Sequence, residues 1–230
     1  DTVEPDAAEQ AEVQTEAVFA HDASDLPADP AVRYGQLENG MRYAILQNDT
    51  PSNTAVLRMA FNAGSINEAD DQRGLAHFLE HMAFKGTARR TALQIAEAIE
   101  DVGGYINAYT SRDVTAYYAR VLSGDVALAL DVIGDIVLNP AFDPREIEVE
   151  RGVILQEIGQ ANDTPDDIVF DHFTETAYRH QTLGRSILGA VGDGPGHQLE
   201  ERRRVERLGP LHADAAPRAV REQLERDHRV

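Results

Sequence analysis

The chain has 230 residues, a formal net charge of −19 and no cysteine, and these totals exclude several classes of protein. So acidic a surface argues against nucleic-acid binding, because phosphate backbones need basic partners. Without cysteine the chain forms no disulfides or thiolate metal sites, so any metal must be bound by His, Asp or Glu. The acidity would suit basic peptide substrates, although maintaining solubility is the simpler interpretation.

The first part of the chain differs in composition from the rest. Residues 1–30 are rich in Ala, Glu, Asp and Pro, which is typical of a flexible acidic leader. Because the chain begins at Asp1 rather than Met, we expect a processed or trimmed N-terminus, and a removed secretory signal would fit. No apolar run approaches the roughly 20 residues of a membrane span, so we expect none.

From residue 31 the apolar pattern predicts an ordered domain. Gly86 and Asp143 are candidate caps, at the end of one helix and the start of another. Strands and helices do not alternate strictly, which favours an α+β fold with helices packed on a mainly antiparallel sheet. In chain order we predict strands at 40–46 and 54–61, helices at 74–84 and 91–102, a strand hairpin at 105–110 and 114–121, and helices at 124–138, 144–160 and 165–178.

The helix at 74–84 carries the order H-x-x-E-H. His77 and His81 lie four residues apart, so both imidazoles project from one helix face and can share one zinc ion. Glu80 is offset around the helix, where it would hold a metal-bound water, and this order is the inverzincin signature. The alternative is an ordinary amphipathic helix with a histidine pair facing solvent. Two histidines are also an incomplete site, because a catalytic zinc takes three protein ligands and a water.

Two glutamates on the predicted helix 144–160 are candidates for the third ligand. Glu150 and Glu157 lie seven residues apart, two helical turns, and therefore share a face. Glu157 has apolar neighbours, and a carboxylate near the buried side needs a partner. Zinc would be such a partner. Periodicity alone, however, favours the alternative, in which Glu157 lies at the boundary of the core and pairs with an arginine.

Several motifs in a consistent order resemble one family. From about residue 40 to 189 the chain is similar to the pitrilysin, insulin-degrading enzyme and mitochondrial processing peptidase family of zinc metallopeptidases, which carry the inverted motif. It looks closest to the bacterial and mitochondrial processing peptidases, which implies one half-clamshell domain. The motifs that carry the resemblance are at 64–65, 77–81, 84–87, 107–110, 150–158 and 183–189.

The resemblance implies a full set of site residues. His77, His81 and Glu157 would bind one Zn²⁺ per chain, and Glu80 would be the general base for the zinc-activated water. Glu150 matches a second family glutamate that would orient a ligand or shape the local charge, and we assign it with Glu80 as catalytic. The resemblance also implies a substrate-binding strand, although for Ala108 to Thr110 a role in the sheet core alone is the alternative. The residues of this strand, which would pair with an extended peptide, are Asn107, Ala108, Tyr109 and Thr110.

The resemblance ends after Ala190. Residues 191–230 form a divergent Arg-rich tail, which we expect to be disordered or marginally helical, and which suggests a truncated domain or a divergent natural ending. The predicted parts are therefore a leader at 1–30, an N-terminal catalytic domain at 31–190 and this tail. Family members usually continue into a second, similar domain. They also continue with a helix and further strands, and the absence of an edge strand would leave backbone open to pairing with another chain.

The preferred hypothesis is a zinc-dependent endopeptidase domain that hydrolyses extended peptides or unfolded proteins. The first alternative is a non-turnover fragment or subunit that binds zinc and peptide but needs a second clamshell domain or a homologous subunit for cleavage. A metal hydrolase for non-peptide substrates is a weaker one. The chain is also a candidate for a homo-oligomer. Its expected location is the periplasm or the outside of a bacterial cell, and the cytoplasm is the alternative. The sequence assigns no role to Arg185.

Overall fold

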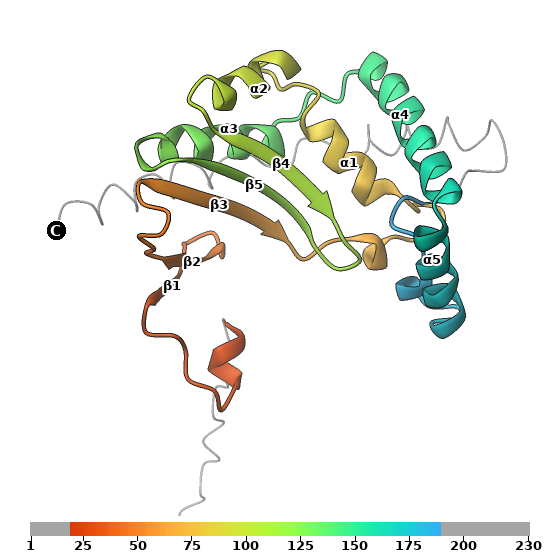
Figure 1. Ribbon diagram of the computed structural model, residues 1–230, viewed down its shortest axis with the longest axis horizontal. Coiled ribbons are helices and arrows are strands. Elements are labelled where there is room, and N and C mark those ends of the chain that lie inside the picture. Colours follow the sequence, from red (N-terminus) through yellow and green to blue (C-terminus); the bar gives the residue numbers. More distant parts are fainter. Residues whose placement is uncertain (1–18, 190–230) are drawn as a thin grey trace, which may run out of the picture. The chain divides into compact units, whose positions relative to one another are not determined.

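A computed structural model describes residues 19–189 of the protein (Figure 1). The first 18 residues of the predicted leader, and the predicted tail at 191–230, lie outside the described residues. The chain divides into two compact units, with the boundary between Asp49 and Thr50. Within the described part of the chain, no helix is both long and apolar enough to cross a membrane.

The first unit contains a short 3-10 helix, η1 (Ala20–Ala23), and a two-stranded antiparallel sheet. Its strands are β1 (Val32–Gln36) and β2 (Arg42–Leu46), of which the sequence predicted only the second. In β1, Gly35 lies against the ring of Tyr43, where an added Cβ would come within 2.3 Å of the ring Cζ. The glycine makes this close packing possible and also weakens the strand pattern in the sequence.

The second unit contains the three-stranded antiparallel sheet that positions the site. Its strands are β3 (Thr54–Phe61), β4 (Tyr105–Thr110) and β5 (Thr115–Leu122), in the order β3-β5-β4. The predicted hairpin of β4 and β5 is confirmed, with Ala108 opposite Tyr117. β4 is therefore an edge strand of the described sheet.

Three helices cover one face of this sheet and two more extend the layer (Figure 1). α1 (Leu75–Ala83) and α2 (Ala92–Glu100) contact β4, and α3 (Val126–Leu138) contacts β3 and β5. α4 (Pro144–Asp163) packs on α1, and α5 (Pro165–Ala177) packs on α4. This arrangement confirms the predicted α+β fold with helices on an antiparallel sheet.

The core lies between the sheet and the helices that cover it, and burial of its apolar side chains is the main force holding the layers together. Residues from α1, α2, α3, β4 and β5 share this core. Its buried members are Ala83, Ile95, Ile99, Ala108, Tyr117, Ala119, Val121, Ala129, Val132, Ile133 and Ile136.

One of the two predicted helix caps is present and the other is not. The side chain of Asp143 accepts a hydrogen bond from the backbone N–H of Arg145 at 2.8 Å and caps α4 as predicted. Gly86 does not cap α1, because the helix already ends at Ala83 with Phe84 as its C-cap. Gly86 instead takes a positive φ of 117° in the turn that follows.

Candidate metal centre

Apolar packing brings the motif helix against α4. Met82 of α1 is fully buried and packs with Ile147 of α4, with Phe78 beside them. His77 and His81 lie four residues apart and share a face of α1, and their contacts with Glu157 turn this face toward α4. The histidines therefore face the helix that carries the predicted third ligand.

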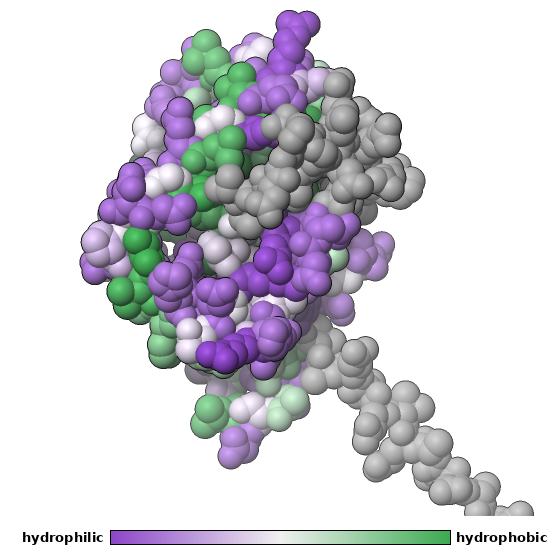
Figure 2. All heavy atoms as spheres, turned by 90° about the vertical axis from the view of Figure 1, so that its right-hand side faces the viewer, coloured by the Kyte–Doolittle hydropathy of each residue, from purple (hydrophilic) through white to green (hydrophobic). Residues whose placement is uncertain are grey.

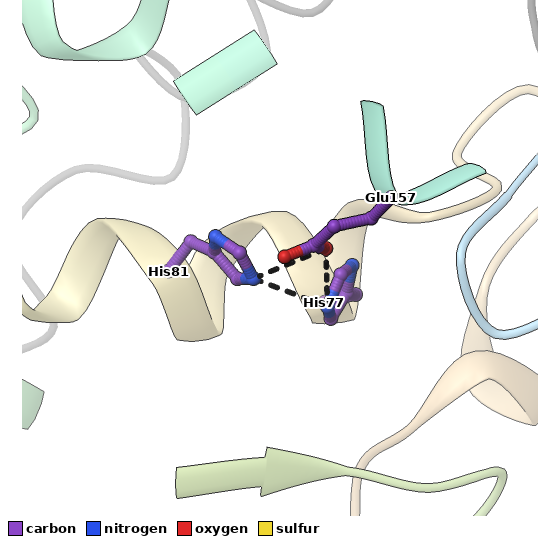
Figure 3. A group of neighbouring side chains, drawn as sticks. All are labelled: His77, His81 and Glu157. Carbon is purple, nitrogen blue, oxygen red and sulfur yellow. Dashed lines mark hydrogen bonds and ion pairs between the residues drawn. The ribbon is translucent and has the colours of Figure 1, made fainter. Parts of the chain in front are cut away.

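His77 and His81 from α1 and Glu157 from α4 point toward one another (Figure 3). The Nε2 atoms of the two histidines lie 3.2 Å apart. Oε2 of Glu157 lies 3.6 Å from Nε2 of His77 and 3.7 Å from Nε2 of His81. Among the described residues, these three form a group whose possible ligand atoms all lie within 4.8 Å of one another.

The distances within this group fit a single zinc ion. Two ligand atoms about 2.1 Å from one ion in tetrahedral geometry lie about 3.4 Å apart. The three observed separations of 3.2, 3.6 and 3.7 Å fall around that value. Two imidazole nitrogens and one carboxylate oxygen also form a donor set that zinc prefers.

Burial keeps His77 in the form that binds metals. The residue is 9% exposed, and its Nδ1 atom has no hydrogen-bonding partner among the described residues. Burial, followed by the proximity of His81, lowers the pKa of His77 from 6.5 to about 4. His77 is therefore a neutral imidazole at neutral pH, with a lone pair available for a cation.

Glu150 orients His81 from the other side of its ring. One carboxylate oxygen lies 2.9 Å from Nδ1 of His81 and the other 2.5 Å from Nζ of Lys85. A proton on Nδ1, donated to Glu150, leaves Nε2 free to bind a metal, which is a common arrangement at histidine ligands. Burial alone would raise the pKa of Glu150, but the hydrogen bonds from Lys85 and His81 outweigh it and lower the pKa, so the group is ionised.

Glu80 lies on a different side of α1, toward β4. The hydroxyl of Thr110 donates a hydrogen bond to Oε2 of Glu80 at 2.8 Å. Burial raises the pKa of Glu80 above its ordinary value, and the bond from Thr110 and the nearby His81 partly offset this effect. A carboxylate with a raised pKa beside a metal group is suited to accepting and returning a proton.

The predicted substrate strand lies on β4, and its residues alternate between the two faces of the sheet. Ala108 is buried and Thr110 reaches Glu80, so both belong to the helix-covered face. Asn107 and Tyr109 belong to the exposed face, where the amide of Asn107 donates to the hydroxyl of Tyr105 at 2.5 Å. Which of these residues contact a substrate stays a prediction.

Sequence reasoning missed two contacts of the site. Lys85 lies in the motif at 84–87, and the sequence assigned it no role. Its position four residues after His81 would have placed both side chains beside one partner, Glu150. The contact of Thr110 with Glu80 joins residues 30 apart in the sequence. It depends on the packing of α1 against β4, for which the sequence offers no local signal.

Residues 43–191 match the insulinase family (peptidase family M16), and the chain belongs to this family. It is 47% identical over 160 residues to the probable beta subunit of the mitochondrial-processing peptidase from Arabidopsis thaliana, covering 70% of this chain and 30% of that protein. It is 48% identical over 155 residues to an uncharacterized zinc protease from Rickettsia bellii, covering 67% of this chain and 37% of the relative. The chain thus spans about a third of the length of these relatives.

Solved structures confirm the fold. The first half of the periplasmic protease PqqL from Escherichia coli superimposes with a TM-score of 0.67 and 27% sequence identity, covering 78% of this chain and 41% of that one. A protease from Helicobacter pylori superimposes with a TM-score of 0.69 at 23% identity, covering 76% of this chain and 42% of that one. The helix-covered antiparallel sheet is therefore the fold that half of each of these proteases contains.

Proposed function

We propose that this chain is a zinc-dependent endopeptidase domain, with His77, His81 and Glu157 as the ligands of one Zn²⁺. The observation that carries the proposal is the convergence of these three groups, from two helices, in a chain of the M16 family. Two relatives, named as a zinc protease and as a processing peptidase subunit, support the same activity.

The chain's own residues supply orientation and proton transfer. When bound, zinc lowers the pKa of water toward about 7 and polarises a carbonyl oxygen. Glu80 takes the proton of the attacking water on its carboxylate and returns it to the leaving amine, while Thr110 holds its Oε2 atom in place. Glu150 keeps the Nδ1 proton of His81 on the outer side of the ring.

We further propose that an extended peptide binds along β4. This strand is an edge of the described sheet, so one row of its backbone groups faces away from β5. Such an edge binds many sequences through the main chain, while pockets for alternate side chains select among them. Glu80 reaches the end of this strand through Thr110, which brings the proton acceptor close to the proposed binding edge.

Metal analysis combined with a cleavage assay tests the proposal. We expect one zinc per chain in the purified protein, loss of zinc in His81→Ala, and cleavage of a quenched peptide that stops with a chelator and returns with Zn²⁺. His172→Ala is the matched control, because this histidine lies on α5 with its side chain 75% exposed and should leave zinc binding unchanged. Unchanged zinc content in His81→Ala would overturn the ligand assignment.

A second candidate is a non-turnover subunit that binds zinc and peptide but needs a homologous second domain. One observation favours it: α4 and α5 expose apolar side chains. The surface on which these helices lie is mainly hydrophilic with separate hydrophobic patches (Figure 2). Full zinc occupancy without any chelator-sensitive cleavage would favour this candidate. The exposed apolar residues are Val149, Leu155, Val169, Phe170 and Phe173.

For the location we propose the periplasm or the outside of a bacterial cell. The support is the structural likeness to PqqL, which is named a periplasmic protease. Fractionation of a bacterial cell that produces the protein tests this: the chain should appear with periplasmic markers or in the medium. Its recovery with cytoplasmic markers alone would contradict the proposal.

A further inference from the structure

A buried carboxylate holds the first turn of the motif helix. Glu68 is 8% exposed and lies in the loop before α1. Its Oε1 atom accepts a hydrogen bond from the N–H of Ala76 at 2.7 Å, and its Oε2 atom accepts one from Gly74 at 2.9 Å. The first N–H groups of a helix have no partner within the helix, and a negative charge beside them is favourable. Glu68 therefore supplies a cap that bridges the backbone donors of Gly74 and Ala76.

An arginine from a distant part of the chain holds this loop in turn. Nη1 of Arg185 donates to the backbone carbonyl of Glu68 at 2.8 Å, and Nη2 binds the carboxylate of Asp70. The side chain of Arg185 is only 17% exposed, although it carries a full charge. It lies 117 residues after Glu68, in the segment that follows α5. One guanidinium thus fixes both the main chain and a side chain of the loop that caps α1.

Two glycines bring the same segments into backbone contact. Gly74 and Gly189 both have positive φ, at 84° and 86°. A Cβ added to Gly189 would lie 2.8 Å from the carbonyl oxygen of Arg73, and one added to Gly74 would lie 2.8 Å from that of Leu188. The segment after α5 therefore lies directly against the turn that starts α1, as the elements are drawn in Figure 1.

We propose that Glu68 and Arg185 are positioning residues of the metal centre. Ala76, whose N–H binds Glu68, immediately precedes His77, and Glu80 follows within one further turn. Fixing this first turn fixes the direction in which His77 points toward Glu157 of α4. Arg185 acts one step further away, by holding the loop from which Glu68 reaches the helix. The inference rests on the proposed function, because it takes His77 as a zinc ligand.

The test compares Glu68→Gln and Arg185→Lys with two matched controls in the full 230-residue chain. Glutamine replaces one of the two accepting oxygens with an NH2 donor, and a lysine cannot span both partners of Arg185. The controls are Glu97→Gln on α2 and Arg179→Lys, both exposed and both of the same chemical change. Zinc affinity is measured by competition with a chromophoric chelator. The visible spectrum of the Co²⁺-substituted protein reports ligand geometry, and circular dichroism reports folding.

We expect Glu68→Gln to weaken zinc binding about tenfold, as changes outside the ligand shell of a metal do, and to alter the Co²⁺ spectrum. Arg185→Lys should weaken zinc binding only about threefold, because Arg185 acts on the metal centre through Glu68. The two control variants should bind zinc as tightly as the wild type. In the metal-free protein, the amide hydrogen of Ala76 should exchange faster in Glu68→Gln. If Glu68→Gln does not fold, Arg185→Lys decides the test.

A purely structural role predicts a different result. The variants would then unfold at a lower temperature, while zinc affinity and the Co²⁺ spectrum of the folded protein would equal those of the controls, and this outcome overturns the inference alone. Zinc that persists in His81→Ala would instead overturn the proposed function, and the inference with it. The two failures are therefore distinguishable in one set of measurements.

Discussion

The two sides of α1 support different parts of the proposed chemistry. On the side facing α4, charged and imidazole groups form a connected cluster of His77, His81, Glu150 and Glu157. On the side facing β4, Glu80 has one hydrogen bond, from Thr110, in a buried setting that raises its pKa. One side is thus built to hold a cation and the other to exchange a proton. Substitutions on the two sides should therefore separate metal binding from catalysis.

The largest expected effect is the loss of the metal from the α4 side. Glu157→Ala removes the carboxylate that lies within 3.7 Å of both imidazole nitrogens, so two ligands remain and stoichiometric zinc should be lost on dialysis. Atomic emission analysis of the dialysed protein measures this. Glu148→Ala is the control, because this glutamate lies on the same helix with its side chain 62% exposed and should leave the zinc content unchanged.

A partial loss is expected for Glu150→Gln. The amide no longer attracts the Nδ1 proton of His81 or neutralises Lys85, so zinc affinity should fall about 10- to 100-fold while the three ligands stay in place. Competition with a chelator gives the affinity, with Glu148→Gln as the control. A zinc affinity equal to that of the control would show that Glu150 does not support the metal.

The side facing β4 should behave in the opposite way. Thr110→Val removes one hydrogen bond to a charged group, so kcat should fall about tenfold while zinc content and affinity stay unchanged. The matched control is Thr115→Val, since Thr115 pairs with Thr110 across the hairpin but donates to the carbonyl of Ala63. A loss of zinc in Thr110→Val would show that the two sides of α1 are not independent.

The smallest expected effect concerns stability and lies away from both sides of α1, at the ion pairs of Asp131 on α3. Burial would raise the pKa of Asp131, but hydrogen bonds from Arg89 and Arg90 outweigh it and lower the pKa below its ordinary 3.8. A group with a depressed folded pKa stabilises the protein above its unfolded pKa, and this contribution disappears as the pH falls through the folded value.

Asp131→Asn should therefore lower the free energy of unfolding by about 0.5 kcal/mol at pH 7, the scale of a pair near the surface. The difference should vanish below the folded pKa of Asp131, and zinc affinity should not change at either pH. Urea denaturation at pH 7 and in acid measures the free energy of unfolding. A difference that grows in acid would contradict the assigned sign.

Much of the fold could be predicted because its signals are local. The bounds predicted for β3 and β4 coincide with those observed, since both strands are rich in apolar, aromatic and β-branched residues. β1 was not predicted, because it is short and contains Gly35. The helix predicted at 144–160 continues to Asp163, and helix ends are set by fine balances of capping and fraying.

The candidate site was likewise predictable only where its signals are local. The pair His77 and His81 follows from helical spacing, whereas choosing Glu157 as the third ligand required the family resemblance. Contacts between remote segments left no trace in the sequence. The bond from Arg185 to the loop of Glu68 spans 117 residues, and only packing of the segment after α5 against that loop creates it. Such contacts come from tertiary structure, so periodicity and spacing do not report them.

We propose above all that Glu80 moves the proton in a cleavage reaction at a zinc centre held by the neighbouring side of α1. The most direct measurement is cleavage of a quenched peptide by wild type and Glu80→Gln, both loaded with the same amount of zinc. We predict a rate for Glu80→Gln that is lower by a factor of about 10² to 10⁴ at equal zinc content, because the amide cannot accept the proton. Equal rates of chelator-sensitive cleavage in the two proteins would contradict the account.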